Sequence, residues 1–408
     1  MDIHLSHTPS NFTGKINITG SKSESNRLLL LQAIYPNLIL TNISNSDDTQ
    51  TIINALKSSK SMVDVHHAGT AMRFLTAYYA FKLKSIVLLT GSKRMQERPI
   101  KILVNALKEL GAIIEYQKAN GFPPIKIKGS NPLKNSVKLS SSVSSQYVSA
   151  LMLVAPKMSD GLTIELSGEI TSLPYIKMTE SLLKTIGVKV ESKNQKLTIF
   201  NKESIENKII SIESDWSSAS YFYSIVALSE NSSLRLSSYK KKSLQGDSCL
   251  ISIYKKLGVF SKFEGNTLVL KKLSYFNAPK QISLNLIDSP DIAQTIAVTC
   301  YGLGIDCDLY GLHTLKIKET DRLSALKKEL TNLGAKISIT DESIHIKSSK
   351  ILNHNLRVST YQDHRMAMAF APLATKVSLI VEDANVVNKS YPDFWKDLQR
   401  IGFQYIKK

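Results

Sequence analysis

A helix-like apolar stripe that ends in glycine and leads into an alternating segment recurs along the chain. The five copies end in Gly111, Gly187, Gly258, Gly334 and Gly402. Each glycine stands where a helix C-cap would place it, and the residues after it alternate as in a strand. A weaker sixth copy, 53–57, precedes them without its glycine. The glycines lie about 70 residues apart, so six units of about 68 residues would account for the chain.

A unit of this length is too long for a solenoid repeat and predicts several strands with two helices. Strand-like alternation occurs at 125–128, 162–166 and 343–347. Helices and strands interleave throughout, so the expected class is α/β (α+β). Six units would divide three and three, with a joint near Ser214 and Asp215. The alternative is that helix–glycine–strand punctuation is simply common in α/β proteins, but five evenly spaced copies favour true repetition.

The composition predicts a globular protein with a sizeable core. Hydrophobic residues make up 43% of the 408 residues, which excludes a disordered or low-complexity chain. The densest apolar stretch, 28–40, is interrupted by Gln32 and Pro36, so no membrane span is expected. The start lacks a signal-peptide pattern, and three cysteines cannot form a disulfide framework, so we expect a reducing cytoplasm.

The charge alone does not identify a partner. Lys plus Arg minus Asp plus Glu is 52 − 34 = +18. The lysines are scattered, and the one dense run, 240–242, has only Tyr239 as a neighbouring aromatic residue. This pattern argues against a nucleic-acid partner, and an acidic small-molecule substrate fits the same charge.

Basic and hydroxyl residues precede several predicted helices. Lys22 stands at the start of one, with Ser23 and Arg27 one turn apart on a shared face. Gly69 allows a ligand to approach the backbone, and Thr70 could cap the following helix. Each segment by itself is as consistent with a capped, solvated helix as with a site.

The next two helix starts have the same character. Pro99 suits the first helical position, which places Arg98 at a helix amino end, where an arginine opposes the dipole unless an anion is present. Ser144, Ser145 and Gln146 precede an apolar helix, and such a cluster of hydroxyl and N–H groups suits a phosphate or sugar. A flexible serine linker is the alternative there.

Further helix starts, in the second half, add carboxylates to the cations. The charged residues that precede these helices are Lys318, Glu319, Arg322, Asp363, Arg365 and Lys389. Asp291 and Glu319 are candidate acid–base groups. Seven such helix starts in one chain indicate a site for polyanionic small molecules. His66 and His67 lack a third ligand at useful spacing, and no phosphate-binding glycine motif occurs, so neither a metal nor a nucleotide is expected.

Together these segments resemble the EPSP synthase (3-phosphoshikimate 1-carboxyvinyltransferase) family. The matching motifs occur in family order: GSKSESNR (20–27), AGTAMR (68–73), RMQERP (94–99), SVSSQ (142–146), SPD (289–291), KETDR (318–322), DHRMAM (363–368) and KSYPD (389–393). The resemblance implies two similar domains, each of three βαβαββ units, with helix N-termini converging on an interdomain cleft. It implies the boundaries 21–213 for the phosphosugar-side domain and 1–20 plus 214–408 for the second. We expect a bacterial monofunctional type that is monomeric.

The resemblance implies transfer of enolpyruvate from phosphoenolpyruvate to the 5-hydroxyl of shikimate 3-phosphate, without a metal or organic cofactor. The implied catalytic residues are Asp291, Glu319 and Lys22. The implied shikimate 3-phosphate contacts are Lys22, Ser23, Arg27, Ser144, Ser145, Gln146, Ser172, Tyr175, Asp291 and Lys318. The implied phosphoenolpyruvate contacts are Lys22, Gly69, Arg98, Gln146, Arg322, Arg365 and Lys389. Repulsion among the unliganded cations is expected to oppose closure of the cleft, and the phosphosugar is expected to favour it.

Two positions depart from the family pattern. His67 stands where the best-known members carry asparagine, and Thr314 stands near an asparagine that contacts the phosphosugar in those members. One alternative is the enolpyruvyl transferase that acts on UDP-N-acetylglucosamine, which usually carries a cysteine in the loop corresponding to 91–99; none occurs here. The other is a catalytically inactive anion-binding homologue, which would be expected to have lost Lys22, Asp291 or Glu319.

Overall fold

The computed structural model describes residues 1–6, 11–140, 144–168, 173–349 and 356–408. The chain forms two compact units, Gly20–Ile212 and Met1–Thr19 with Glu213–Lys408. Each position at which the chain passes from one unit to the other lies one residue before the boundary expected from the sequence. The amino-terminal segment belongs to the second unit because strand β2 (Thr13–Ile16) pairs in parallel with β13 (Ser233–Leu236).

The unit Gly20–Ile212 contains three sheets and seven helices in its described residues. Its helices are α1 (Lys22–Ile34), α2 (Asp47–Lys57), α3 (Gly69–Phe81), α4 (Lys93–Gln96), α5 (Lys101–Glu109), α6 (Ser145–Val154) and α7 (Leu173–Thr185). Its strands are β3 (Leu38–Thr41), β4 (Met62–Asp64), β5 (Ile86–Thr90), β6 (Ile113–Tyr116), β7 (Ile125–Lys128), β8 (Ser136–Ser140), β9 (Leu162–Ser167), β10 (Val190–Lys193), β11 (Lys196–Ile199) and β12 (Lys208–Ser211).

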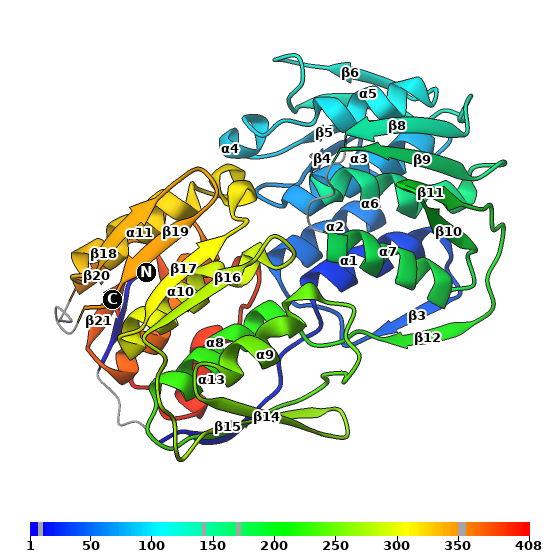
Figure 1. Ribbon diagram of the computed structural model, residues 1–408. Helices are drawn as coiled ribbons and strands as arrows, with labels where there is room; N and C mark the ends of the chain where they lie inside the picture. The colour runs from blue at the N-terminus through cyan, green and yellow to red at the C-terminus, as the bar shows by residue number, and fades with distance from the viewer. Residues whose placement is uncertain (7–10, 141–143, 169–172, 350–355) are drawn as a thin grey trace. The chain divides into compact units, whose positions relative to one another are not determined.

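Two of these sheets arise from complete βαβαββ segments. Their strand orders are β4-β5-β7-β6 and β8-β9-β11-β10. In the second, β8 runs parallel to β9, and β9 and β10 both run antiparallel to β11. Figure 1 shows α6 and α7 beside this sheet. The third sheet contains β12 and β3 only, among the described residues. The helix that follows β3, α2, is the repeat copy that lacks the glycine. Its C-cap residue, Ser58, has extended rather than left-handed backbone.

The other unit contains three four-stranded sheets in the part of it that the structure describes. Their orders are β14-β15-β13-β2, β16-β17-β19-β18 and β20-β21-β1-β22. Besides β2 and β13, its strands are β1 (Ile3–Leu5), β14 (Val259–Glu264), β15 (Thr267–Lys272), β16 (Gln281–Asn285), β17 (Asp306–Tyr310), β18 (Lys336–Ile339), β19 (Ile344–Lys347), β20 (Leu356–Val358), β21 (Leu379–Val381) and β22 (Tyr405–Lys407). Its helices are α8 (Trp216–Leu228), α9 (Leu250–Lys255), α10 (Ala293–Leu303), α11 (Arg322–Asn332), α12 (His364–Phe370) and α13 (Phe394–Arg400).

The five predicted glycines adopt the left-handed backbone that ends a helix. Their φ angles lie between 85° and 111°. They follow α5, α7, α9, α11 and α13 and lead into β6, β10, β14, β18 and β22. Because only glycine adopts this region without steric cost, the repeat seen in the sequence marks a structural repeat, and that prediction is confirmed.

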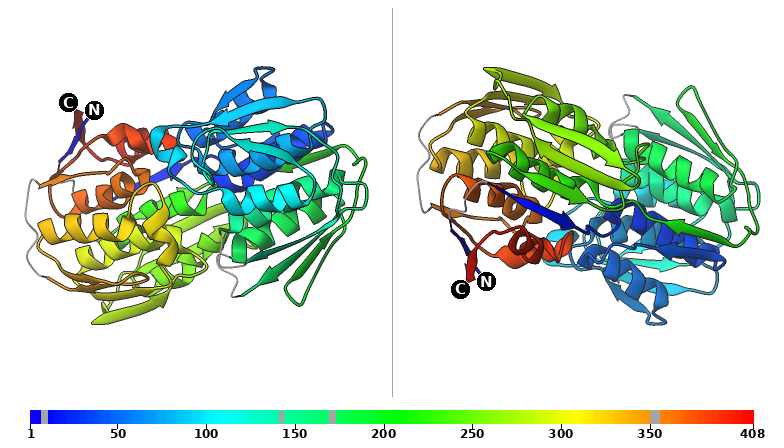
Figure 2. Two further views of the ribbon diagram at one scale, coloured as in Figure 1. Left: turned by 90° about the horizontal axis from the view of Figure 1, so that it is seen from above. Right: turned by 90° about the horizontal axis from the view of Figure 1, so that it is seen from below.

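The core of each unit consists of helices, with sheets that keep one face in water. Ile125 and Ile127 of β7 are buried, whereas Lys126 and Lys128 between and after them are exposed. Helices α6 and α8 have buried side chains on all sides, which is typical of helices enclosed by other elements. Accordingly, α6 contacts α3 and α7, and α8 contacts α10; Figure 2 shows these helices from two further directions. Among the described residues, no helix is long and apolar enough to span a bilayer.

Candidate active site

The amino end of α3 carries no side-chain cap and lies against Arg98. Ala68 is the N-cap residue, and the hydrogen bond from Met72 N to Ala68 O opens the helix. A Cβ atom built on Gly69 would stand 2.8 Å from Nη1 of Arg98, so the guanidinium rests on the Gly69 backbone. Free N–H groups at a helix start, together with a guanidinium, are suited to bind an anion.

A buried arginine holds this arrangement in place. Arg73 is 5% exposed and donates to the carbonyl oxygens of Gly69 (3.1 Å) and Pro99 (3.2 Å). Tyr147 of α6 also donates to Pro99 O, at 2.6 Å. These bonds fix the backbone on both sides of the contact between Gly69 and Arg98. Sequence reasoning quoted Arg73 within a motif but assigned it no role.

Two local predictions in this region were wrong. Thr70 does not cap α3, because it lies inside the helix; its Oγ1 instead accepts a hydrogen bond from Gln146 Nε2 at 3.3 Å. This bond links the amino ends of α3 and α6. Pro99 is not the first residue of α5, which begins at Lys101 with Ile100 as its N-cap.

The backbone explains why α5 starts late. Arg98 N donates to Met95 O at 3.1 Å, which closes the turn after α4. Ile100 N donates to Gly121 O at 2.9 Å. Ile100 has a non-helical backbone (φ −134°, ψ 0°), and its carbonyl oxygen accepts the opening bond of α5 from Val104 N at 3.1 Å. Arg98 therefore lies before the helix, against Gly69 rather than at the helix mouth.

Arg27 joins three helices of this unit. It is 2% exposed, and its Nε donates to Thr179 Oγ1 at 2.7 Å. Its Nη atoms donate to Ser23 O (2.8 Å), Ser149 Oγ (3.1 Å) and Tyr175 O (3.4 Å). Four of the five guanidinium N–H groups therefore donate to acceptors among the described residues.

The environment of Arg27 is strongly desolvated. Burial lowers the pKa of Arg27 to about 10, against the opposing effects of Tyr175 and Glu24. Its guanidinium also lies 5.4 Å from the centre of the Phe74 ring. Arg27 thus remains charged at neutral pH. Thr179 and Ser149 are partners that no local sequence signal indicates, since they lie 152 and 122 residues away along the chain.

The remaining predicted residues of this unit lie at helix starts. Lys22 Nζ lies 3.3 Å from Oδ2 of Asp48, a buried carboxylate in α2 that sequence reasoning missed. Ser144 caps α6 by accepting from Gln146 N at 3.3 Å, with Ser145 as the first helical residue. Tyr175 lies in the first turn of α7. Ser172 lies outside the described residues.

In the other unit, Arg322 binds three carboxylates. Its Nε donates to Asp363 Oδ2 at 2.6 Å, and its Nη atoms donate to Asp291 Oδ1 and Glu319 Oε2, both at 2.9 Å. Arg322 is 2% exposed. Burial lowers its pKa, but the three carboxylates outweigh burial and raise the pKa of Arg322 above its ordinary value.

Three more cations surround the two candidate acid–base carboxylates. Lys389 Nζ lies 2.8 Å from Glu319 Oε1. Lys318 Nζ lies 3.6 Å from Asp291 Oδ1, and Arg365 Nη2 lies 3.2 Å from Asp291 Oδ2. Arg365 Nη1 also donates to Asp291 O at 2.8 Å.

Cations and carboxylates therefore alternate in this cluster. Asp291 raises the pKa of Lys318, but burial and the charges of Arg322 and Arg365 have the larger combined effect, and the net direction is downward. Each of these four cations contacts a carboxylate. The expected repulsion that opposes closure involves cations of both units and stays a prediction.

The sequence predicted where most of these groups stand along the helices. Asp291 lies in the 3₁₀ helix Pro290–Ile292 directly before α10. Asp321 caps α11 by accepting from Leu323 N and Ser324 N. Asp363 caps α12 by accepting from Arg365 N, and it is fully buried. Sequence reasoning placed Asp363 at a helix start but missed its bond to Arg322, which joins residues 41 positions apart.

The two positions that depart from the family pattern have different surroundings. His67 Nδ1 lies 2.9 Å from Ser92 Oγ, and Ser92 caps α4 by accepting from Met95 N. His67 therefore contacts the segment that carries Arg98. Thr314 Oγ1 is buried without a hydrogen-bond partner among the described residues.

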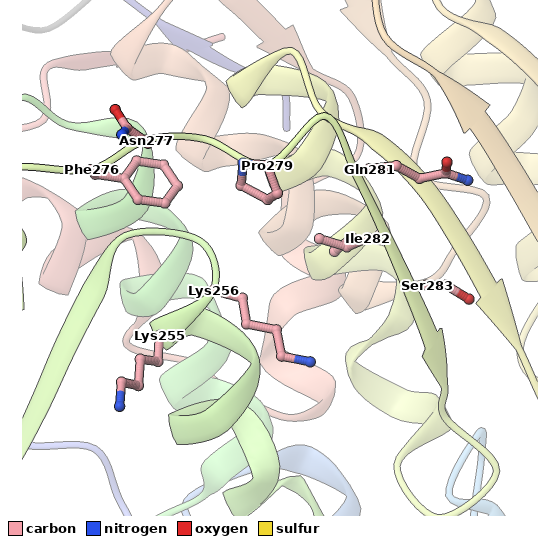
Figure 3. Close-up of a pocket in the computed structure, with 8 residues that line it drawn as sticks. All are labelled: Lys255, Lys256, Phe276, Asn277, Pro279, Gln281, Ile282 and Ser283. Carbon is pink, nitrogen blue, oxygen red and sulfur yellow. The ribbon is translucent and has the colours of Figure 1, made fainter.

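A cavity of about 450 Å³ has lining residues that belong to neither cluster. It lies between α9 and the segment that leads into β16, and its lining residues are Lys255, Lys256, Phe276, Asn277, Pro279, Gln281, Ile282 and Ser283. Figure 3 shows Ile282 directed toward Lys256, whereas Gln281 and Ser283 project from the other side of the strand. None of the predicted site residues lines this cavity, so its size does not make it the catalytic centre.

Comparison with known proteins identifies the family. The family model for EPSP synthase (3-phosphoshikimate 1-carboxyvinyltransferase) matches residues 57–398. A 3-phosphoshikimate 1-carboxyvinyltransferase of Bacteroides fragilis (strain YCH46) is 41% identical over 404 residues, which cover 98% of both chains. One of Aliivibrio salmonicida is 34% identical and covers 96% of this chain and 98% of its own. The solved structure of EPSP synthase from Acinetobacter baumannii shares the fold, with a TM-score of 0.79, 20% identity and full coverage of both chains.

Proposed function

This chain belongs to the EPSP synthase family, and we infer from that membership that it transfers the enolpyruvyl group of phosphoenolpyruvate to the 5-hydroxyl of shikimate 3-phosphate. In this reaction C3 of phosphoenolpyruvate gains a proton while the hydroxyl oxygen bonds to C2. The resulting tetrahedral intermediate then loses a C3 proton and phosphate. The products are an enolpyruvyl ether and inorganic phosphate, so atoms balance without a redox partner.

Our proposal assigns proton transfer to three residues. Asp291 accepts the proton of the 5-hydroxyl as its oxygen attacks C2. Glu319 and Lys22 transfer the proton at C3 and assist the departure of phosphate. Holding both substrates in register before reaction removes much of the entropic barrier, which is the role of the surrounding cations and hydroxyl groups.

The proposed binding residues come from both units. Those for shikimate 3-phosphate are Lys22, Ser23, Arg27, Ser144, Ser145, Gln146, Ser172, Tyr175, Asp291 and Lys318. Those for phosphoenolpyruvate are Lys22, Gly69, Arg98, Gln146, Arg322, Arg365 and Lys389. The uncapped start of α3 under Arg98 supports an anion at that position.

The observation that carries the proposal is that Asp291 and Glu319 bind the same guanidinium. Each carboxylate lies 2.9 Å from an Nη atom of Arg322. Two carboxylates held this closely by one rigid, planar cation can serve one small substrate from fixed positions. A solvated helix start, the alternative considered for each segment separately, does not account for three carboxylates bonded to one buried arginine.

The test is phosphate release from phosphoenolpyruvate with each candidate acceptor in turn. We expect release with shikimate 3-phosphate and none above background with UDP-N-acetylglucosamine. Release only with the sugar nucleotide would assign the chain to the related cell-wall reaction. No release with either acceptor, from a chain that binds shikimate 3-phosphate, would support the inactive anion-binding homologue.

We also propose that the enzyme is a monomer of the cytoplasm that needs neither metal nor organic cofactor. Sedimentation velocity of the purified chain tests the first point, since a dimer would double the mass of 45.3 kDa. Full activity after exhaustive treatment with EDTA is the expected result for the cofactor. Activity that depends on an added divalent cation would contradict it.

A further inference from the structure

A chain of hydrogen bonds connects Arg365 to a buried carboxylate that has no assigned role. The Ser217 hydroxyl, in the first turn of α8, donates to Oδ2 of Asp247. Arg365 Nη2 donates to the same Ser217 oxygen at 3.3 Å. Asp247 lies in the 3₁₀ helix Gly246–Cys249 and is 5% exposed.

The chemistry of these groups determines which of them donates and which accepts in each hydrogen bond. An ionised carboxylate only accepts hydrogen bonds, and a serine hydroxyl has a single proton to donate. With that proton on Asp247, the lone pairs of Ser217 are free to face the guanidinium. Asp247 therefore determines that Ser217 acts as an acceptor toward Arg365.

Arg365 is held at both Nη atoms. Nη1 donates to Asp291 O at 2.8 Å, and Nη2 lies 3.2 Å from Asp291 Oδ2 in addition to its bond to Ser217. A guanidinium is planar, so contacts at both Nη atoms fix the orientation of its whole plane. Ser217 is the contact that comes from a different element than Asp291.

We propose that Asp247 and Ser217 are positioning residues that orient the Arg365 guanidinium toward the anionic groups of phosphoenolpyruvate. The inference rests on the role of Arg365 in the proposed function. Neither residue is proposed to contact the reacting atoms. Their effect is on the capture of phosphoenolpyruvate rather than on proton transfer.

The surroundings of Asp247 make this series of hydrogen bonds sensitive to pH. Burial raises the pKa of Asp247 to about 7, and Asp291 and Asp215 add to this direction, against Arg365 and the Ser217 hydrogen bond. The Cys249 thiol, on the same 3₁₀ helix, donates to Ser289 Oγ at 3.3 Å and stays neutral because burial raises its pKa to about 11. A protonated Asp247 no longer requires the proton of Ser217, so the serine hydroxyl is free to rotate and its lone pairs are no longer held toward Arg365. Orientation of Arg365 by this chain therefore strengthens as the pH rises through about 7.

Steady-state kinetics of Ser217→Ala test the proposal. We expect KM for phosphoenolpyruvate to rise about tenfold, since a hydrogen bond to a charged group is lost, with KM for shikimate 3-phosphate unchanged within about twofold. Ser217→Thr keeps the acceptor oxygen and should restore most of the affinity. The matched control is Ser220→Ala, which lies one turn later in α8 and removes a buried hydroxyl bonded to Ser217 O and Thr295; it should leave both KM values unchanged.

A second readout is the pH profile of kcat/KM for phosphoenolpyruvate. Asp247→Asn should remove an ionisation near neutral pH from this profile, whereas the ionisation of phosphoenolpyruvate itself contributes equally to both enzymes. An unchanged profile, or equal effects of Ser217→Ala and Ser220→Ala, would overturn the positioning role.

Arg365→Lys distinguishes a failure of the role proposed for Arg365 from a failure of its positioning by Ser217 and Asp247. If that variant leaves KM for phosphoenolpyruvate unchanged, the proposed role of Arg365 itself fails; if KM rises while Ser217→Ala has no effect, only the positioning chain fails.

Discussion

The guanidinium of Arg322 is bonded to Asp363, Asp291 and Glu319 at once. Removing the charge of either Asp291 or Glu319 leaves two carboxylates on Arg322. A single Asp→Asn or Glu→Gln change at these positions therefore preserves most of the arrangement. This makes a kinetic effect of either change interpretable as loss of a proton-transfer group.

We predict that Glu319→Gln and Asp291→Asn each lose turnover by about 10²–10⁴-fold, the usual contribution of general acid–base catalysis. Binding of shikimate 3-phosphate, measured by calorimetry, should stay within about tenfold of wild type. Glu342→Gln changes an exposed carboxylate and serves as the control. A kcat near wild type in either variant would remove that residue from the mechanism.

Arg98 is expected to act as an anion clamp rather than a proton carrier. Arg98→Lys keeps the charge but loses the planar fork that lies against Gly69, so KM for phosphoenolpyruvate should rise while affinity for the phosphosugar changes little. Arg94→Lys is the matched control, because Arg94 is exposed in the same segment and pairs with Glu97. Equal losses for both substrates in Arg98→Lys would show that the position is structural.

Asp247 should make stability depend on pH. Burial raises its pKa in the folded protein from the ordinary 3.8 to about 7. A raised carboxyl pKa means that its stabilising contribution is present below the unfolded pKa and is lost as the pH rises through about 7. The loss approaches roughly 4 kcal/mol at high pH, since one pKa unit corresponds to about 1.4 kcal/mol. Asp247→Asn should therefore gain Tm relative to wild type between pH 5 and pH 8.5; a difference independent of pH would contradict the raised pKa.

At the scale of elements, the contact between α1 and α7 depends on Thr179. Its hydroxyl accepts from Arg27 Nε and donates to Tyr175 O within α7. Thr179→Val leaves a buried guanidinium N–H without its acceptor, so unfolding by urea should show a loss of about 1.5–3 kcal/mol. Thr185→Val is closely matched, since Thr185 makes the same bond to the carbonyl four residues earlier but is exposed. Equal losses in the two variants would show that Arg27 does not depend on this bond.

At the scale of the whole molecule, the proposed shikimate 3-phosphate contacts come from both units. A ligand that binds residues of both units has higher affinity for conformations in which both groups of residues contact it. Only such a difference in affinity shifts the population of conformations toward a closed one. We therefore predict a smaller radius of gyration by small-angle scattering when shikimate 3-phosphate alone is added. Phosphate at the same concentration is the control. An unchanged radius at saturation would refute closure as the step that couples the two substrates.

The salt dependence of this compaction is expected to be small. The sequence predicts repulsion among unliganded cations of both units, but Lys318, Arg322, Arg365 and Lys389 each contact a carboxylate of their own unit. Added salt has less repulsion to screen when the charges are already paired at short range.

The sequence by itself determined the features that depend on local chemistry. Glycine adopts the left-handed backbone that ends a helix at little steric cost, so Gly111 and its four counterparts, each after an apolar helical stripe, marked the repeat correctly. Capping is equally local, because the side chain of Asp321 or Asp363 bonds to N–H groups two or three residues later. The ordered motifs were sufficient to predict the family, which the family model and the relatives then showed.

Only the tertiary structure decided which groups pair with one another. Arg27 reaches Thr179 across 152 residues, and Arg322 reaches Asp363 across 41. Such bonds form only when packing brings distant helix ends within about 3 Å, and no local pattern encodes that distance. The same holds for Asp247, whose neighbours along the chain do not reveal that Ser217 links it to Arg365. The residue types and helix starts could be read from the order of amino acids, whereas burial and long-range contact determined which charges are paired with one another.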